Sequence, residues 1–217
     1  MSRRLDWPGF LNARDLGGLP LRSGGETRPA GLIRSALPGG PARPSPRTLA
    51  DYGVRTVIDL RSPRELAARP SPLHGLPGYR HLPLLGDREM DTVIEMPGLA
   101  GSYRWKVDNR GEAIAAILAF MADAPRGGIL FHCLAGRDRT GVVAALLLSV
   151  AGVDRASIIE DYVLSDGTVQ DGFRPLPWVM ADLLDHLDRC HGGVPAYMAE
   201  VGVEATTLAA LRRRLLG

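Results

Sequence analysis

The most constraining feature of this sequence is a strand-like segment that passes through a short glycine-containing loop into an apolar helix. Residues 128–132, Gly-Ile-Leu-Phe-His, form a short apolar run that predicts a buried strand. Residues 140–150 contain no charged side chain and predict a buried helix, with Gly152 as its expected C-cap. Strand, loop and helix in this order are typical of α/β proteins, so the segment indicates a layered α/β fold.

The rest of the chain repeats this alternation of strand and helix patterns. β-branched and apolar runs predict two more strands, at 54–60 and 79–85. Helical patterns cover 112–123, 157–164, 178–190 and 204–216. Residues 1–50 are rich in Gly, Pro and Arg and are expected to be mostly loop and short strand. With 217 residues and no repeat, the chain is expected to form a single domain over 1–217.

Composition argues against several classes of partner. The formal net charge is only +2, which favours neither a nucleic acid nor a membrane surface. The two cysteines, Cys133 and Cys190, form no disulfide framework and suggest a reducing compartment. No apolar stretch approaches the ~20 residues of a membrane span, so no integral membrane segment is expected. The first residues lack a signal-peptide core, so a cytoplasmic location is expected, with export without a cleavable signal as the alternative.

Residues 132–141 read His-Cys-Leu-Ala-Gly-Arg-Asp-Arg-Thr-Gly, and their placement predicts an anion site. Cys133 lies at the carboxyl end of a strand, the edge at which α/β sheets bind ligands. The following helix N-terminus presents unpaired N–H groups that bind phosphate. Gly136 and Gly141 allow the backbone to turn tightly around an anion. The expected substrate-binding residues are His132, Leu134, Ala135, Gly136, Arg137, Thr140 and Gly141, with Arg61 at the rim.

The spacing Cys133-x5-Arg139 predicts a reaction at phosphorus. A curled loop places the sulfur at its base, while the arginine closes over the phosphate and stabilises transition-state charge. Cys133 must react as a thiolate, and the helix N-terminus, the loop N–H groups and the arginines are expected to lower its pKa. Thr140 is expected to hydrogen-bond the sulfur, and His132 to orient the loop. The alternative is a buried structural cysteine beside an ordinary turn.

A metal is not expected at this loop. His132 and Cys133 are adjacent and lack a second ligand pair, which does not match zinc spacing. No metal and no cofactor are therefore predicted for the reaction.

The loop resembles those of the protein tyrosine phosphatase superfamily. Within it, HCLAGRDRTG is similar to the HCxAGKDRTG loop of bacterial triple-specificity phosphatases of the protein tyrosine phosphatase B type. NARDLGG at 12–18 and IDLRSPRE at 58–65 also resemble motifs of that family. The tail segments IIEDY, HGGVPAYM and LAALRRRLLG agree as well.

This resemblance implies a central, mostly parallel sheet flanked by helices, with a helical lid within 84–108, for which an ordinary surface loop is the alternative. It also implies hydrolysis of phosphotyrosine, with phosphoserine/threonine and phosphoinositide as further substrate classes. The partner is then a phosphorylated protein or a phosphoinositide. Arg137 stands where the family has lysine, which leaves lipid activity open.

The proton donor for the leaving group has two candidates, since no Trp-Pro-Asp motif is present: Trp7 and Pro8 are followed by Gly9. Asp138 lies in the loop and is favoured by the family resemblance. Asp59 ends the preceding strand, where sheet topology aims it at the same pocket. Either carboxylate has a structural alternative, Asp59 as a partner of Arg61 and Asp138 as a brace of the loop.

The predicted mechanism is two-step covalent catalysis through a phosphocysteine. Two rival functions are a rhodanese-like sulfurtransferase and a pseudophosphatase that binds phosphoproteins without turnover. The arginine of the loop followed by Thr140 favours phosphate chemistry over sulfur transfer. His74, His81, His186 and His191 lie in no recognised motif and are interpreted as bystanders, and Cys190 as inert.

Overall fold

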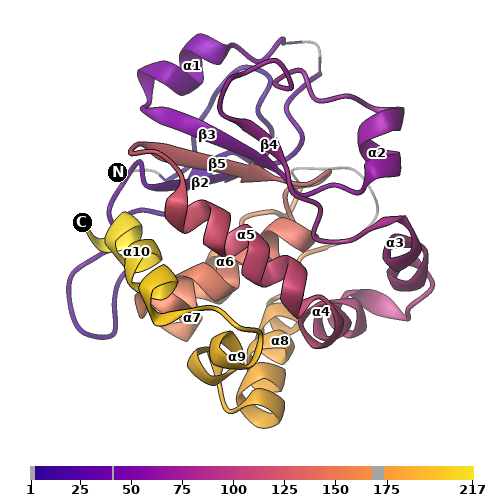
Figure 1. Cartoon of the computed structure of the whole chain (residues 1–217), viewed down its shortest axis with the longest axis vertical. Coiled ribbons are helices and arrows are strands. Elements are labelled where there is room, and N and C mark those ends of the chain that lie inside the picture. Colours follow the sequence, from indigo (N-terminus) through magenta and orange to yellow (C-terminus); the bar gives the residue numbers. More distant parts are fainter. Residues whose placement is uncertain (1–2, 41, 168–173) are drawn as a thin grey trace.

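The computed structural model describes residues 3–40, 42–167 and 174–217, and its strands form one five-stranded sheet (Figure 1). The strand order is β1-β2-β5-β3-β4. β2, β5, β3 and β4 are parallel, and only β1 at the edge runs antiparallel. The strands are β1 (Arg14–Asp15), β2 (Leu32–Ser35), β3 (Val54–Asp59), β4 (Tyr79–His81) and β5 (Gly128–His132). Positions 1, 2 and 41 of the expected N-terminal loop region lie outside the described residues.

Helices flank both faces of the sheet, which confirms the predicted α/β class. Figure 1 shows α1 and α2 above the sheet, α5, α6 and α10 below it, and α3 and α4 at one side. The helices are α1 (Pro46–Asp51), α2 (Pro63–Ala68), α3 (Asp87–Ile94), α4 (Gly98–Asn109), α5 (Gly111–Asp123), α6 (Asp138–Ala151), α7 (Arg155–Val163), α8 (Pro177–His191), α9 (Val194–Glu200) and α10 (Ala205–Leu216).

Alternating side chains of the strands build a core on each face. In β5, Leu130 joins the smaller cluster, which includes Leu49 of α1. Its neighbours Ile129 and Phe131 join the larger cluster formed with α5, α6 and the C-terminal helices. Strands buried on both faces read as continuous apolar runs, which is why the strand patterns at 54–60 and 128–132 were recognisable.

The carboxyl ends of the parallel strands meet at one edge. His132 of β5 pairs in register with Ser35 of β2 on one side and with Asp59 of β3 on the other. Asp59 in turn pairs with His81 of β4. The loop that begins at Cys133 therefore emerges between the segments that follow β2 and β3, so both can contact it.

Several predicted boundaries shift for local reasons. The strand expected at 79–85 ends at His81, and Pro83 has no N–H for a ladder. The helix expected at 140–150 begins at Asp138. The short helices α1 and α2 were not predicted, although each starts at a Ser-Pro pair. In α2, Ser62 and Glu65 form a capping box, a sequence signal for a helix N-terminus.

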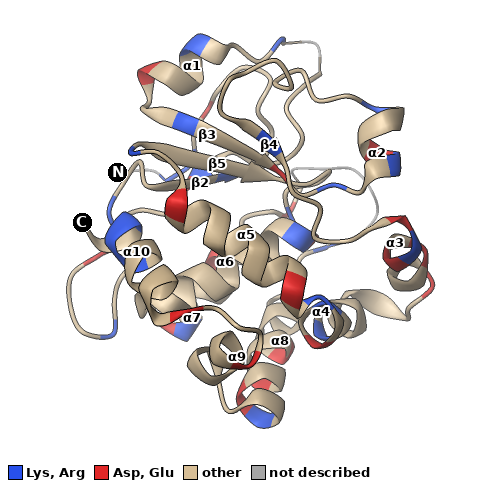
Figure 2. Ribbon diagram, in the orientation of Figure 1, with Lys and Arg blue, Asp and Glu red and all other residues tan. Residues whose placement is uncertain are grey.

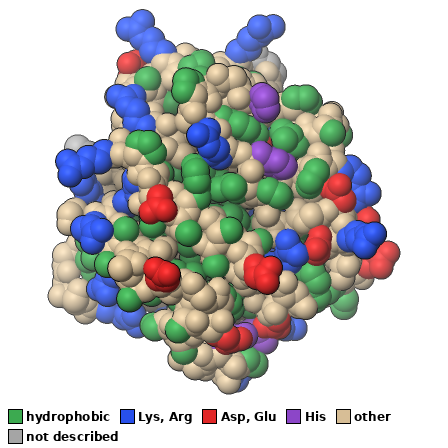
Figure 3. Space-filling model, viewed as in Figure 1, with side chains coloured by type: hydrophobic (Ala, Val, Ile, Leu, Met, Phe, Trp, Pro, Cys, Tyr) green, Lys and Arg blue, Asp and Glu red, His purple; other side chains and the backbone are tan. Residues whose placement is uncertain are grey.

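Charge is spread over the molecule. Figure 2 shows acidic and basic residues together on α3 and α4. The face seen in Figure 3 carries both signs of charge beside apolar side chains, in keeping with the net charge of +2. Within the described part of the chain, none of the helices combines the length and the apolar character needed to cross a bilayer.

Candidate active site

The Cys133 loop connects β5 to α6 and is nearly buried. Cys133 has only 1% of its surface exposed, and Gly136 adopts a positive φ of +66°. A Cβ at position 136 would lie 2.2 Å from the carbonyl oxygen of Ser35. Only glycine therefore allows the loop to turn this closely against the end of β2.

Side chains from the N-terminal region hold the carbonyl groups of this loop. Asn12 Nδ2 donates to the carbonyl oxygens of Ala135 and Gly136, at 3.1 Å each. An Arg34 guanidinium NH2 donates to the same Gly136 oxygen at 2.8 Å. Because a trans peptide points its N–H away from its C=O, the amides of Gly136 and Arg137 face the opposite side. This arrangement gives the loop inward N–H groups suited to an anion.

A buried carboxylate anchors these N-terminal side chains. Asp161 of α7 accepts hydrogen bonds from Arg14 at 3.0 Å, from Arg34 at 2.7 Å and from Arg3 at 2.7 Å. Burial alone would raise the pKa of Asp161, but the three guanidinium charges hold it well below its usual value. Burial lowers the pKa of Arg14 to about 10. The NARDLGG motif thus braces the loop, since Arg14 also bonds to Asn12 and Ser165.

Arg139 is held by a residue that the sequence analysis did not assign to the site. Both carboxylate oxygens of Glu65, in α2, accept hydrogen bonds from its guanidinium. Burial opposes the charge of Arg139, yet this hydrogen bond outweighs burial and raises its pKa. Burial would likewise raise the pKa of Glu65, but Arg139 holds it below its ordinary value. Glu65 therefore acts on Arg139 as a positioning residue.

Asp138 faces a cavity of about 250 Å³ between the Cys133 loop and the helices α3 and α4. Its Oδ1 accepts a hydrogen bond from the hydroxyl of Tyr103 at 2.7 Å. Arg137 donates to both carboxylate oxygens at 3.2 Å. The Asp138 side chain remains 25% exposed, so a ligand in the cavity can reach it.

Lys106, the only lysine in the chain, also lines this cavity. It lies on α4, is 3% exposed, and donates to the carbonyl and hydroxyl oxygens of Ser102 at 3.0 Å each. Burial lowers its pKa to about 8, although the charges of Asp138 and Cys133 oppose that effect. The sequence signal for this residue was a single lysine among 26 basic residues.

Asp59 and Arg61 lie away from the cavity, in a fully buried pair. Arg61 donates to Asp59 through Nε and NH2 at 2.6–3.1 Å, and the Tyr79 hydroxyl adds a bond of 2.9 Å. Arg61 NH1 also binds the Arg69 carbonyl at 2.6 Å. Burial would raise the pKa of Asp59, but its hydrogen bonds to Arg61 hold it below normal. Arg61 has no exposed surface, so it does not form a rim.

His132 and Thr140 sit in the floor of the loop, both with no exposed surface. His132 Nδ1 lies 3.1 Å from the Cys133 carbonyl, which only accepts, so Nδ1 carries the proton. Burial lowers the pKa of His132, so the ring is neutral near pH 7. Thr140 Oγ1 is buried without a hydrogen-bond partner among the described residues. Leu134 is 44% exposed, and Ala135 and Gly141 are buried.

Comparison with known proteins gives a consistent result. A family model described as "Tyrosine phosphatase family" matches residues 5–217. The chain is 29% identical over 199 residues to "Tyrosine-protein phosphatase" of Nostoc commune, an alignment that covers 77% of this chain and 68% of the relative. It is also 29% identical over 198 residues to "Triple specificity protein phosphatase PtpB" of Mycobacterium tuberculosis, with 75% of this chain and 69% of that protein covered.

Proposed function

Because this chain belongs to the tyrosine phosphatase family, we propose that it hydrolyses phosphotyrosine monoesters through a phosphocysteine intermediate. The observation that carries this proposal is the orientation of the Cys133 loop. Its Ala135 and Gly136 carbonyl groups point outward, because they accept hydrogen bonds from Asn12 and Arg34. That arrangement leaves inward N–H groups above a buried sulfur. Oriented N–H groups can bind a phosphate before reaction and stabilise the charge that develops during it.

In the proposed first step, the Cys133 thiolate attacks phosphorus and the bond to the tyrosine oxygen breaks. Asp138 gives its proton to the departing oxygen. Arg139, held by Glu65, stabilises the equatorial oxygens together with the loop N–H groups. In the second step a water attacks phosphorus, Asp138 takes the water's proton, and the S–P bond breaks. The buried Thr140 hydroxyl, which has no partner among the described residues, donates to the departing thiolate.

We propose Asp138 rather than Asp59 as the proton donor. Asp138 is partly exposed to the cavity that Arg139 and Lys106 also line. Asp59 is fully buried, and its oxygens are taken by Arg61 and Tyr79. A dianionic phosphate attracts the Arg137 guanidinium, which in turn frees an oxygen of Asp138 for proton transfer.

The proton donor can be identified from the dependence of rate on the leaving group. We expect Asp138→Asn to lower kcat by roughly 10²–10⁴-fold with poorly acidic leaving alcohols. The loss should shrink with p-nitrophenyl phosphate, since that leaving group departs without a proton. Asp59→Asn, checked for folding, should show no such dependence. A larger leaving-group dependence in the Asp59 variant would reverse the assignment.

The substrate is expected to be an aromatic phosphoester on a protein. The cavity combines apolar side chains from α3 and α4, such as Met90 and Leu99, with the cations Lys106 and Arg137. The apolar wall suits a phenyl ring, and we propose that α3 and α4 act as the lid over the loop. The two cations also support a phosphoinositide headgroup as a second substrate class.

A substrate panel tests this function directly. We expect phosphate release from a phosphotyrosine peptide with a higher kcat/KM than from matched phosphoserine and phosphothreonine peptides. Phosphoinositide vesicles form a separate arm, and substantial hydrolysis there would add the lipid class. Binding of the phosphotyrosine peptide without any phosphate release would instead support the pseudophosphatase alternative. Sulfur transfer from thiosulfate without phosphate release would support the sulfurtransferase alternative.

A further inference from the structure

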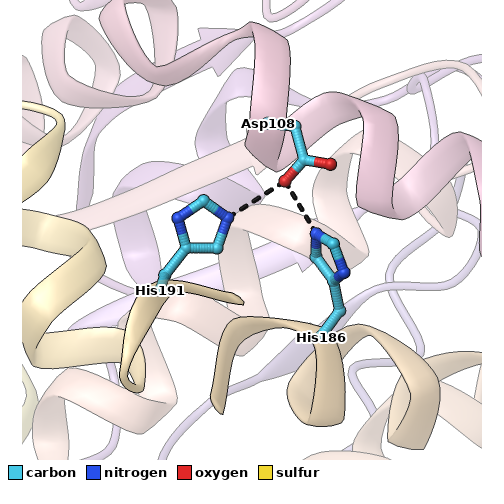
Figure 4. A group of neighbouring side chains, drawn as sticks. All are labelled: Asp108, His186 and His191. Atoms are coloured by element: carbon cyan, nitrogen blue, oxygen red, sulfur yellow. Dashed lines mark hydrogen bonds and ion pairs between the residues drawn. The ribbon is translucent and has the colours of Figure 1, made fainter. Parts of the chain in front are cut away.

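Three side chains with metal-binding atoms lie close together in space, and none of them belongs to the Cys133 loop. Asp108 comes from the last turn of α4, and His186 and His191 come from the C-terminal part of α8 (Figure 4). Asp108 Oδ1 lies 2.7 Å from His186 Nε2 and 3.0 Å from His191 Nε2. One donor atom from each residue lies within 4.8 Å of the other two.

The far nitrogen of each imidazole is already engaged by a second group. His191 Nδ1 lies 2.8 Å from the carboxylate of Glu200 in α9, and Nε2 lies 3.0 Å from that of Asp108, so both nitrogens carry protons because a carboxylate only accepts. Metal binding releases the Nε2 proton to solvent and leaves the Nδ1 proton on Glu200's side. His186 Nδ1 lies 3.5 Å from the sulfur of Cys190. A carboxylate on the far ring nitrogen is typical of metal-bound histidines, because it fixes the ring and leaves Nε2 as the ligand.

We propose that Asp108, His186 and His191 bind a Zn²⁺ ion outside the catalytic site. Two imidazole nitrogens and one carboxylate oxygen suit zinc and similar transition metals better than Mg²⁺ or Ca²⁺. Zinc bonds of about 2.0–2.1 Å in a tetrahedron separate neighbouring ligand atoms by roughly 3.3 Å. The gaps from Asp108 Oδ1 to the two rings, 2.7 and 3.0 Å, need to open only slightly, and all three ligand atoms already lie within 4.8 Å of one another. Water takes the fourth position.

The surroundings suit a bound ion that stays accessible from solvent. The side chains of His186 and His191 are 14% and 11% exposed, so packing restricts their rings, while Asp108 at 38% leaves an entry path. The two imidazole rings pack edge to face with centroids 5.6 Å apart, and His191 also packs on Tyr197. Rings held in this way lose little freedom when a metal binds.

The ion would join the C-terminal ends of α4 and α8. α4 carries Tyr103, which donates to Asp138, and Lys106, which lines the cavity. Tyr197 of α9 already bonds to the Val107 carbonyl at 2.9 Å, so this end of α4 is an anchor point. Zinc there stabilises the folded chain and fixes the anchored end of the proposed lid, while the chemistry at Cys133 needs no metal.

Zinc titration by calorimetry tests the site, in a Cys133→Ser background so that the reactive thiol adds no binding. We expect one Zn²⁺ per chain and a rise in Tm of about 5 °C at a hundredfold excess over Kd, with no rise in Mg²⁺. His186→Gln and His191→Gln should each weaken zinc binding at least tenfold. The matched control, His74→Gln, removes an exposed imidazole elsewhere and should bind zinc normally.

A second variant separates coordination from mere charge pairing. Glu200→Gln leaves all three ligands in place and should weaken zinc binding by about 10–100-fold, as expected for a group that orients a ligand. Co²⁺ bound in place of Zn²⁺ should give a visible absorption band that His191→Gln abolishes. Absence of zinc binding, or binding that survives both histidine substitutions, would overturn the proposal and leave a set of ion pairs. Neither result bears on phosphate hydrolysis at Cys133.

Discussion

Cys133→Ser is expected to lower kcat by at least ~10⁴-fold, as removal of a covalent nucleophile does in other enzymes. A serine hydroxyl is a far weaker acid than a thiol, so it needs a general base before it can attack phosphorus, whereas a cysteine thiolate does not. The loop N–H groups and Arg139 are untouched, so a phosphotyrosine peptide should still bind. The measurement is steady-state hydrolysis together with peptide affinity.

Cys190→Ser is the matched control for this loss. Cys190 is exposed at the end of α8 and contacts His186, not the Cys133 loop. We expect its kcat to remain within a factor of two of the parent protein, an approximate bound for a surface change. Equal loss of activity in both variants would indicate a thiol effect unrelated to nucleophilic attack. Retained turnover in Cys133→Ser would contradict the covalent mechanism.

Asp161→Asn is expected to reduce the free energy of unfolding by about 3–5 kcal/mol, because it leaves buried arginines without their countercharge. Arg14 and Arg34 are each 1% exposed, and both depend on this carboxylate. Asparagine keeps the shape of the side chain but not its charge. Denaturant unfolding gives the free energy, and a drop in Tm of roughly 6–20 °C should accompany it.

Asp91→Asn supplies the contrast, since Asp91 pairs with Arg64 and both are more than half exposed. A change of no more than about 1 kcal/mol is expected for such a surface pair.

The pKa of Asp161 is lowered in the folded chain, so its contribution to the free energy of unfolding is present above the ordinary carboxyl pKa and is lost as pH falls below it. The parent protein should therefore lose stability on acidification more steeply than Asp161→Asn. Equal stability of the two asparagine variants would contradict the role assigned to Asp161.

The elements that sequence predicted best are those buried on both sides. The β5 strand, the Cys133 loop and α6 are contiguous, so their apolar runs and glycine spacing carry the information locally. The helices α3 and α4 were harder to foresee, because Pro97, Gly98 and Gly101 interrupt their pattern. In the structure Gly98 opens α4 with a φ of +78°, and Gly101 lies within the helix. Packing of Tyr103 and Val107 into the core outweighs the cost of glycine there.

The contacts that position the catalytic groups were less predictable than the groups themselves. Asn12 reaches Ala135 across 123 positions of sequence, and Glu65 reaches Arg139 across 74. Pairings of this kind depend on strand order, which no local pattern encodes. The same holds for Asp59, whose place at a strand end suggested catalysis but whose neighbours Arg61 and Tyr79 enclose it. The fold also places Lys106 at the cavity. The only feature of the sequence that pointed to this residue is that it is the single lysine of the chain.

The most direct test of the central claim is to capture the covalent intermediate. A phosphotyrosine peptide carrying a radiolabelled phosphate is mixed with the protein, and turnover is stopped within milliseconds by denaturant. Digestion and mass spectrometry should then locate the label as phosphocysteine at Cys133, and the label should disappear on a chase with unlabelled peptide. Steady hydrolysis with no label on the protein, or label confined to another residue, would contradict nucleophilic attack by Cys133.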